Sequence, residues 1–208
     1  MLAGWACGRH SGGMIFGVDE AGRGPLAGPV VAGAVWLGES AIAGLADSKK
    51  LSAKRRAVLE ARIKAEAHWA VGVVEAEEID RINIFAATML AMTRAVAGLV
   101  AQVGEPALAL IDGNKTPQGR VPEWRWAARA IVGGDASEAA ISAASIIAKE
   151  HRDRIMQALA VQHPAYGWER NAGYGTAEHL AALQAYGATA HHRRSFRPVA
   201  LVLEKTAR

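Results

Sequence analysis

The chain has 208 residues, enough for one domain with a large buried core, and 51% of them are hydrophobic against 21% charged. This balance is typical of a globular protein and excludes an intrinsically disordered one. A formal net charge of +4 mildly favours a polyanionic partner, and the single cysteine, Cys7, excludes an intrachain disulfide and fits a reducing compartment.

No segment predicts export or insertion into a membrane. The first residues lack the basic start and the long apolar core of a secretory signal. The longest uncharged stretch near them, residues 24–38, is rich in glycine and proline and too short to span a bilayer. We therefore expect a cytoplasmic protein.

Short apolar runs with β-branched residues predict strands, and longer runs with helical spacing predict helices. In chain order the predicted strands cover residues 14–18, 30–36, 69–75, 107–111 and 127–132. The predicted helices cover residues 52–68, 77–103, 138–160 and 177–187, with Ser52 and Thr176 as N-cap residues of the first and last. Strands interleaved with long helices predict an α/β layer structure with a mixed or parallel central sheet. In such folds binding sites gather beyond the ends of the strands.

Two of the predicted helices carry an apolar face that we expect to pack on the core. The face of the first helix consists of Val58, Ala61, Ile63 and Ala65. The face of the second consists of Phe85, Met89, Met92, Val96 and Leu99. Ordinary packing explains its methionines better than a Met-rich binding surface does. Trp124 and Trp126 are likewise expected to pack in the core or at its rim.

Four acidic residues follow apolar strands: Asp19, Glu20, Asp112 and Asp135. A fold with these strands side by side brings the four carboxylates into one place. Because like charges raise one another's pKa, such a cluster persists when cations neutralise it, and ligands that are all oxygen suit Mg²⁺ or Mn²⁺. Two such ions activate water and stabilise the leaving oxygen when a phosphodiester is cut. The sequence therefore predicts a metal site for phosphate chemistry.

Simpler interpretations of these acids remain open. Taken singly, Asp112 in "IDGN" and Asp135 in "GGDASE" are equally well explained as turn residues, and Asp135 also as an acid at a helix N-terminus. Asp19 and Glu20 are neighbours, and neighbours on a regular strand point to opposite faces. Either the strand ends or bulges at Asp19, or one of the two residues contributes its backbone carbonyl.

The segment Gly22-Arg23-Gly24 places a cation between two residues that have no side chain. It fits neither the Walker A motif nor the dinucleotide-binding fingerprint. Glycine lets a backbone approach a ligand closely, and a ribose 2′-hydroxyl, both donor and acceptor, is the small group that distinguishes RNA from DNA. A tight turn that requires positive φ explains the same residues equally well.

Basic and aromatic residues extend the case for a nucleic-acid partner. Lys49 and Lys50 lie in "DSKKLSAKRR" at the start of a predicted helix, where backbone amides also favour anions. "HHRRSF", residues 191–196, is a second basic run, and for both runs a solvated basic surface is the commoner outcome. Tyr174, between two glycines, can stack on a sugar or base, or simply anchor its loop.

Taken together and in order, these segments resemble bacterial ribonuclease HII. The resemblance covers residues 14–198 and rests on "GVDEAGRGPLAGPVVAGAV", "DSKKLS", "NIFAATMLAMTRAVAGL", "LIDGN", "GGDASEAAISAASIIAK", Arg152-Asp153, "GYGT" and "GATAHHRRSF". It implies an RNase H-like fold with a mixed central sheet and a helical C-terminal portion. It also implies cleavage of RNA in RNA/DNA hybrids, or at single ribonucleotides in duplex DNA, that leaves a 3′-hydroxyl and a 5′-phosphate.

The resemblance assigns roles to single residues. It implies that the metal-binding, catalytic acids are Asp19, Glu20, Asp112 and Asp135. The substrate-binding residues that it implies are Gly22, Arg23 and Gly24 at the ribose 2′-hydroxyl, Tyr174 beside the RNA-to-DNA junction, and Lys49 and Lys50 at phosphates. It implies one catalytic domain and a monomer, with an extension over about residues 1–13 and a substrate-binding, helical and loop portion over about residues 163–208.

Two positions depart from the family pattern, because Gly133 and Ala172 stand where lysine is common, which lowers the positive charge near the substrate. Two other functions remain open. Another RNase H-like nuclease, such as a resolvase, would use the same acids on branched DNA, but the Gly-Arg-Gly segment argues against it. A hybrid-binding protein with a decayed site is the other, and the four intact acids argue against that.

Overall fold

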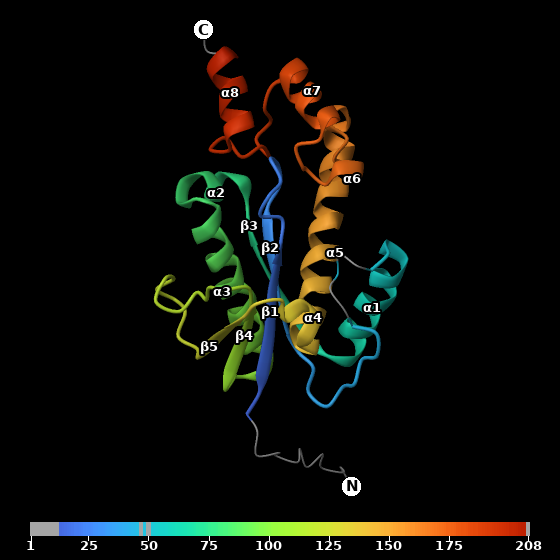
Figure 1. Ribbon diagram of the computed structural model, residues 1–208, viewed down its shortest axis with the longest axis vertical. Helices are drawn as coiled ribbons and strands as arrows, with labels where there is room; N and C mark the ends of the chain where they lie inside the picture. The colour runs from blue at the N-terminus through green and yellow to red at the C-terminus, as the bar shows by residue number, and fades with distance from the viewer. Residues whose placement is uncertain (1–12, 46–47, 49–50, 207–208) are drawn as a thin grey trace.

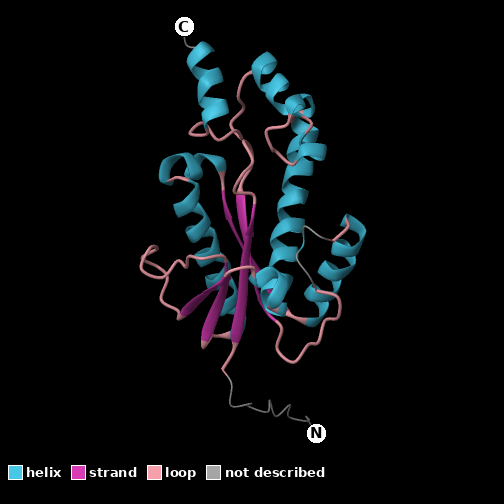
Figure 2. Cartoon of the chain, in the orientation of Figure 1, coloured by secondary structure: helices cyan, strands magenta, loops and turns pink. Residues whose placement is uncertain are grey.

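The computed structural model describes residues 13–45, 48 and 51–206. Its centre is a five-stranded sheet, which Figure 2 draws in magenta between two groups of helices. The strands are β1 (Ile15–Ala21), β2 (Val30–Trp36), β3 (His68–Val74), β4 (Leu108–Asp112) and β5 (Ala128–Ile131). They lie in the order β3-β2-β1-β4-β5. All five predicted strands are confirmed.

The sheet is mixed, as predicted. β1, β2 and β3 pair antiparallel, whereas β1, β4 and β5 pair parallel. The carboxyl ends of three parallel strands therefore lie at one edge of the sheet. Three of the four acids predicted to bind metal, Asp19, Glu20 and Asp112, lie at this edge.

Helices cover both faces of the sheet and continue beyond it. The helical segments are α1 (Ala53–Glu66), α2 (Ala76–Ile82), α3 (Ile84–Val103), α4 (Gly134–Ser137), α5 (Ala139–Gln162), the 3-10 turn η2 (Pro164–Tyr166), α6 (Trp168–Asn171), α7 (Ala177–Tyr186) and α8 (Arg197–Thr206). α3 packs on one face and α5 on the other, where α1 joins it. Figure 1 shows α6, α7 and α8 beyond the end of the sheet that lies away from the N-terminus, with α5 extending toward them.

Glycines in the sheet allow α5 to lie directly on it. A Cβ atom at Gly17 of β1 would come within 2.1 Å of the carbonyl carbon of Ala140, and one at Gly33 of β2 within 2.5 Å of the carbonyl oxygen of Ala144. Real Cβ atoms do not approach backbone this closely, so these two positions require glycine for packing. The side chains of α5 that follow are thereby held against the end of β1.

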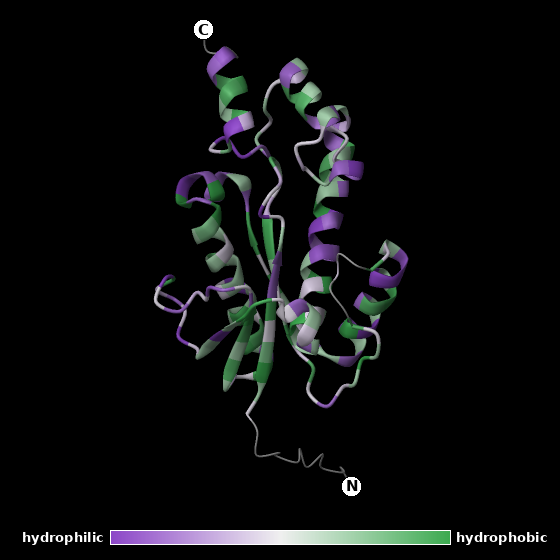
Figure 3. Ribbon diagram, viewed as in Figure 1, coloured by the Kyte–Doolittle hydropathy of each residue, from purple (hydrophilic) through white to green (hydrophobic). Residues whose placement is uncertain are grey.

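α3 is the core helix of the opposite face. The residues that it buries include Met89, Met92, Val96 and Leu99, as predicted, whereas Phe85 remains 38% exposed. Within the described residues it is also the one helix long and apolar enough to cross a membrane. Its apolar side covers the sheet, which is what the core helix of a globular protein does, and in Figure 3 the hydrophobic green of α3 and of the strands meets at this layer.

Other helices differ from the prediction in position or in the face they bury. Residues 77–103 form two helices, because Asn83 has φ of 68° and its side-chain oxygen accepts the N–H of Ala86 to cap α3. α1 begins after Ser52 and buries Ile63, as predicted, together with Leu59. The prediction was wrong for Val58, Ala61 and Ala65, which are exposed. The predicted stripe was therefore displaced by about one residue around the helix.

The C-terminal helices also follow the prediction in part. α7 has Thr176 as its N-cap and ends at Gly187, where φ is 78°, as predicted. α8 was not predicted as a separate helix. It packs through Val199 and Val202 against α7 residues such as Leu183, so its stability comes from tertiary contacts that the sequence alone does not indicate. Trp124 and Trp126 are buried, as predicted.

The close approach of α5 predicts a strong effect of a single methyl group. Gly33→Ala should lower the free energy of unfolding by about 1–3 kcal/mol, because the new Cβ forces α5 away from the sheet. In a chain of this size that corresponds to a fall in Tm of roughly 2–4 °C per kcal/mol, measured by calorimetry. Gly24→Ala is the control, since its Cβ would meet only a ring atom of Tyr174, at 3.4 Å. Equal Tm values for the two variants would contradict the explanation.

Candidate active site

Three acidic residues converge at the edge where β1, β4 and β5 end. Val18 of β1 pairs with Ile111 of β4, so the next residues along the two strands, Asp19 and Asp112, lie side by side. Asp112 pairs in turn with Ile131 of β5. Asp135 then enters from α4, four residues further along the chain. The parallel register thus brings together residues that are far apart in the sequence.

The three carboxylates form a compact cluster. One oxygen from each of Asp19, Asp112 and Asp135 lies within 4.8 Å of the others. Asp19 is buried, and burial raises the pKa of its carboxyl well above the ordinary value, with the charges of Glu20 and Asp112 raising it further. A hydrogen bond from Ser145 opposes this rise in pKa. The cluster therefore holds more negative charge than its surroundings neutralise.

Hydrogen bonds fix the orientation of these acids. The backbone N–H of Glu20 donates to Oδ1 of Asp19 over 2.7 Å, and that of Asp135 donates to Oδ1 of Asp112 over 3.3 Å. The hydroxyl of Ser142 donates to the carbonyl of Asp135 over 2.6 Å and so ties α4 to α5. These contacts hold the carboxylates of Asp19 and Asp112 in place and keep α4 beside the end of β4.

The donor set suits a hard divalent cation. All the candidate ligand atoms are carboxylate oxygens, as Mg²⁺ and Mn²⁺ prefer. In the part of the chain that the structure describes, no other group of three or more acidic, histidine or cysteine side chains meets the same spacing. The raised pKa of the buried Asp19 carboxyl is what close carboxylates produce where a bound metal would neutralise them.

Glu20 is not part of this cluster. β1 continues without a bulge through Glu20, which pairs with Ala32, and ends at Ala21. The strand end or bulge expected at Asp19 is therefore wrong. The side chain of Glu20 nevertheless interacts with that of Asp19 and with the charge of Asp112. The carboxylate of Glu20 accepts a hydrogen bond from Arg23 over 3.4 Å. Burial raises the pKa of Glu20 while the charge of Arg23 opposes the rise. A ligand role through its backbone carbonyl, or through a side-chain rotation, stays a prediction.

A cavity of about 240 Å³ opens next to the cluster. Its lining residues are Glu20, Ala21, Gly22, Arg23, Gly24, Ser48, Ser145, Lys149, Arg152 and Tyr174. The predicted Gly-Arg-Gly segment and Tyr174 therefore share one pocket, although they are 150 residues apart in the chain. Tyr174 is 51% exposed, so its ring is available for stacking. This exposure favours stacking over a packed loop anchor, and the role of Tyr174 stays a prediction.

The two glycines of the turn have different requirements. Gly22 has φ of 94°, and a Cβ atom there would lie 2.0 Å from Nε of Arg152 and 2.8 Å from the carbonyl of Pro29. Gly24 has no such restriction, and its Cβ would meet only the ring of Tyr174, at 3.4 Å. A side chain at Gly22 would displace Arg152 before it touched a ligand, whereas one at Gly24 would enter the cavity itself.

Two buried arginines support the turn. Arg193 lies in the "HHRRSF" segment, and instead of forming a solvated basic surface it is completely buried, next to buried His192. Arg152 of α5 is 2% exposed. The sequence could have indicated its burial, because Arg152 falls within a row of buried residues spaced four apart. The others in this row are Ala144, Ala148, Met156 and Ala160. Arg193 lies in a loop and has no such periodicity.

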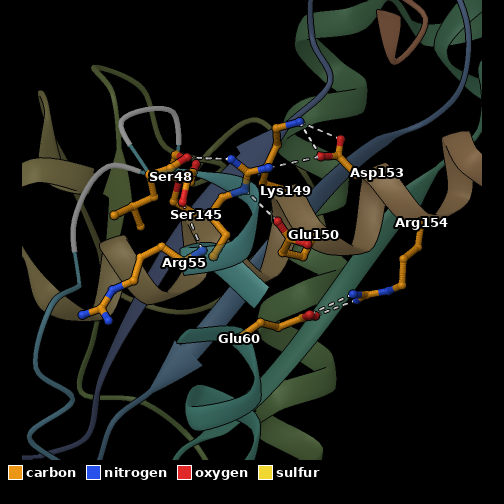
Figure 4. Close-up of polar contacts among 11 residues, drawn as sticks. Ser48, Arg55, Glu60, Ser145, Lys149, Glu150, Asp153 and Arg154 are labelled. Atoms are coloured by element: carbon orange, nitrogen blue, oxygen red, sulfur yellow. Dashed lines mark hydrogen bonds and ion pairs between the residues drawn. The ribbon is translucent and has the colours of Figure 1, made fainter. Parts of the chain in front are cut away.

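Polar contacts along α5 link the cavity to the loop before α1 and to the acidic cluster. Oγ of Ser145 lies 2.8 Å from Oγ of Ser48 and also bonds Asp19, so one serine joins a loop residue to the acidic cluster. Lys149 lines the cavity and donates to Asp153 one turn further along α5, at 2.6 Å. Figure 4 shows this pair facing each other, with Ser48 and Ser145 close by. None of these contacts was identified from the sequence.

The remaining predicted positions are only partly described. Lys49 and Lys50 lie outside the described residues. Gly133 and Ala172, where the family commonly has lysine, have φ of 69° and 48°, in the left-handed region. Nothing lies within 4 Å of a Cβ at Gly133, so a side chain there would point into open space.

A chain of histidines lies behind Tyr174. Nδ1 of His192 accepts the backbone N–H of Thr189 over 3.0 Å, which leaves the proton of the neutral ring on Nε2. That nitrogen lies 3.1 Å from Nε2 of His179, whose Nδ1 is 2.9 Å from the carbonyl of Tyr174. Both rings therefore have to be neutral for the chain to form. Burial, followed by the charges of His179 and its neighbours, lowers the pKa of His192 to about 3.

Comparison with known proteins agrees with this geometry. Residues 16–199 match the family model of ribonuclease HII. The chain is 68% identical over 191 residues to ribonuclease HII of Novosphingobium aromaticivorans, a match that covers 89% of this chain and 96% of that protein. Among solved structures, ribonuclease H2 from Pyrococcus horikoshii superposes with a TM-score of 0.75 at 26% identity, covering 94% of this chain and 99% of that one. Bst-RNase HIII in complex with Mn²⁺ shares the fold, with a TM-score of 0.76 at 20% identity over 92% of this chain and 70% of that one.

The repulsion among the acids predicts how stability responds to metal. Adding Mg²⁺ or Mn²⁺ should raise Tm, because a cation that binds only the folded state stabilises it by mass action. Asp19→Asn should raise the Tm of the metal-free protein by roughly 2–4 °C for each kcal/mol of repulsion removed, and should reduce the gain on adding metal. Scanning calorimetry with and without metal measures both effects. A variant with lower metal-free Tm and an unchanged response to metal would contradict this explanation.

The neutral histidine chain predicts a loss of stability in acid. In the unfolded chain His192 titrates near 6.5 and in the folded protein at about 3. The unfolded state therefore binds more protons between these values, and stability falls as pH is lowered through this window. His192→Asn should make Tm fall less steeply between pH 6.5 and pH 4. His68→Asn, at an exposed histidine of β3, is the control and should keep the wild-type slope. Parallel profiles for all three proteins would refute the assignment.

Proposed function

The chain belongs to the ribonuclease HII family and is an endoribonuclease of that type, and from this premise we propose which bonds it cuts. The proposed substrates are the RNA strand of RNA/DNA hybrids and duplex DNA that carries single ribonucleotides, nicked on the 5′ side of the ribonucleotide. The proposed products carry a 3′-hydroxyl and a 5′-phosphate. The observation that supports this assignment is that the acidic cluster and the Gly22–Gly24 turn adjoin one cavity.

The acids hold the metal in this proposal. The assigned ligands are Asp19, Asp112 and Asp135, together with Glu20. Mg²⁺ or Mn²⁺ held there supplies the activation of the attacking water and the stabilisation of the leaving oxygen. Bst-RNase HIII, which shares the fold, has been solved in complex with Mn²⁺, and this supports a divalent ion of the same kind here. The hydrogen bonds to Asp19 and Asp112 keep both carboxylates oriented before the substrate arrives.

The cavity selects the ribonucleotide. Gly22, Arg23 and Gly24 are assigned to the ribose 2′-hydroxyl, because a turn without bulky side chains lets backbone groups reach it. Tyr174 is assigned to stacking at the RNA-to-DNA junction, in keeping with its exposed ring. Lys149 places a cation at the same cavity, where it attracts the phosphate backbone. Lys49 and Lys50 are assigned to further phosphate contacts.

The C-terminal residues complete the substrate site in this proposal. Residues 163–208 include Tyr174 and the loop that carries Arg193, and both lie at the cavity or directly behind it. We assign this portion and the sheet to a single catalytic domain that acts as a monomer. Its proposed place of action is the cytoplasm, where hybrids and ribonucleotide-containing DNA of a bacterial cell are found.

Cleavage of a labelled duplex with one ribonucleotide tests the assignment. With Mg²⁺ or Mn²⁺ the protein should nick on the 5′ side of the ribonucleotide and leave the all-DNA duplex intact. Asp19→Asn should reduce kcat on the order of 10²-fold or more, as removal of a group that stabilises transition-state charge does. No nick with either metal, or undiminished cleavage by Asp19→Asn, would overturn the proposal.

Stacking by Tyr174 has a separate signature. Tyr174→Ala should weaken binding of the junction by about 1–3 kcal/mol, the usual contribution of one stacked base. The loss should appear mainly in KM. Tyr186→Ala is the matched control, because Tyr186 is also an exposed tyrosine but lies at the end of α7, outside the residues that line the cavity. Equal KM values for the two variants would exclude a stacking role.

A further inference from the structure

Two buried guanidinium groups lie against the turn that the proposed function assigns to ribose recognition. Arg152 and Arg193 are 2% and 0% exposed. Within the described residues neither forms an ion pair with a carboxylate. A buried charge is very costly unless other polar groups compensate it, so these two side chains need hydrogen-bond partners. All of their hydrogen bonds go to backbone carbonyls instead.

Arg193 fixes the peptides of the turn itself. Its Nη2 donates to the carbonyl of Gly22 over 2.6 Å, its Nη1 to that of Arg23 over 3.0 Å, and its Nε to that of Gly28 over 2.9 Å. In a trans peptide the carbonyl and the following N–H point in opposite directions. With the carbonyls of Gly22 and Arg23 turned toward Arg193, the N–H groups of Arg23 and Gly24 point away from it.

Arg152 packs against Gly22 and joins the segment that follows the turn to the loop of Tyr174. Its Nε donates to the carbonyl of Pro29 over 2.9 Å and its Nη2 to that of Ala27 over 3.1 Å. Its Nη1 reaches across to the carbonyl of Ala172, two residues before Tyr174, over 3.0 Å. One side chain of α5 therefore ties the segment behind the turn to the loop that carries Tyr174.

The turn needs such support because its own backbone is permissive. Gly22 and Gly28 both have positive φ, and peptides that adjoin glycine rotate between conformations at little steric cost. The turn lies in the segment between the end of β1 at Ala21 and the start of β2 at Val30. The one pairing of this segment among the described residues is an isolated bridge between Ala27 and His192. Rotation of either peptide beside Arg23 would exchange a donor for an acceptor at the cavity. Which N–H groups of the turn can meet a ribose thus depends on the groups that hold the carbonyls of Gly22 and Arg23 toward the opposite side.

We propose that Arg193 and Arg152 are positioning residues that hold the Gly-Arg-Gly turn in the one peptide orientation able to distinguish a ribonucleotide from a deoxyribonucleotide. This inference rests on the proposed role of the turn in ribose recognition. The arginines act from behind the turn, and they set specificity without touching the acids. Arginine suits this task because its planar fork donates to several carbonyls at fixed angles, which the single ammonium of lysine does not.

Binding measurements in an inactive background test this without relying on catalysis. The background is Asp112→Asn, which leaves the residues of the turn and their neighbours in the chain unchanged. Fluorescence anisotropy with Mg²⁺ gives the Kd for a duplex with one ribonucleotide and for the matched all-DNA duplex. Adding Arg193→Lys or Arg152→Lys should reduce the ratio of the two Kd values about tenfold, equal to about 1.4 kcal/mol of differential binding. Affinity for the all-DNA duplex should stay within about twofold of the background, a change below 0.5 kcal/mol on the same scale.

The control is Arg94→Lys, since Arg94 also donates to a backbone carbonyl, that of Val73, but lies on α3 outside the cavity. It should keep the ratio of the background. If the background itself fails to distinguish the two duplexes, the proposed role of the turn is wrong. If it distinguishes them and both lysine variants, folded by circular dichroism, keep the ratio, then the positioning role is wrong and ribose recognition stands. Loss of the fold in both lysine variants would also contradict the proposal, because residues that only position a turn are dispensable for the sheet.

Discussion

Repulsion among carboxylates at the end of three parallel strands is the constraint on which the rest of the structure depends. Asp19, Asp112 and Asp135 place one oxygen each within 4.8 Å of the others, and burial makes the charge of Asp19 still more costly. An isolated loop could not hold such groups together, because it would relax by moving them apart. A hydrogen-bonded sheet register cannot relax in this way. The core that α3 and α5 form on its two faces offsets the electrostatic cost, which a bound divalent cation then removes.

α5 connects the chemistry to the recognition of the substrate. Its approach to Gly17 and Gly33 brings Ser145 to Asp19, and the following turns of the same helix place Lys149 and Arg152 at the cavity. One rigid element thus determines the distance between the acidic cluster and the turn. A shift of this helix would disturb both sites together. The two glycines in the sheet are therefore functional positions, although they contact no ligand.

Most of the fold and the position of the acids could be predicted because their signals are local. Each strand is a short apolar run, and each acid follows such a run. The break between α2 and α3 at Asn83 escaped prediction, since the apolar spacing continues through it and only the backbone conformation of that residue interrupts the helix. The wrong face of α1 has a similar origin, because Leu59 and Val58 are both apolar and only the packing partner decides which is buried.

The supporting residues could not be predicted, for a different physical reason. Arg193 belongs to a run of basic residues, and the usual fate of such a run is exposure. Its burial depends on carbonyl groups of a turn 165 or more residues away in the chain, which no periodicity indicates. Glu20 illustrates another limit, because the family pattern groups it with the other acids, whereas its carboxylate lies outside the compact group of three and accepts a hydrogen bond from Arg23.

The proposed metal site and the proposed ribose site share β1 and the turn that follows it, yet different contacts hold them in place. The acids are positioned by the strand register, whereas the turn is positioned by two guanidinium groups from α5 and the C-terminal loop. If the proposed roles hold, substitutions behind the turn should change which sugar is accepted without altering the acidic cluster. The reverse also holds, because removing one carboxylate leaves the carbonyl contacts of Arg152 and Arg193 in place. The proposed roles in specificity and catalysis are thus adjacent in the chain, but they depend on different contacts, because Arg152 and Arg193 bond backbone carbonyls whereas the strand register positions Asp19 and Asp112.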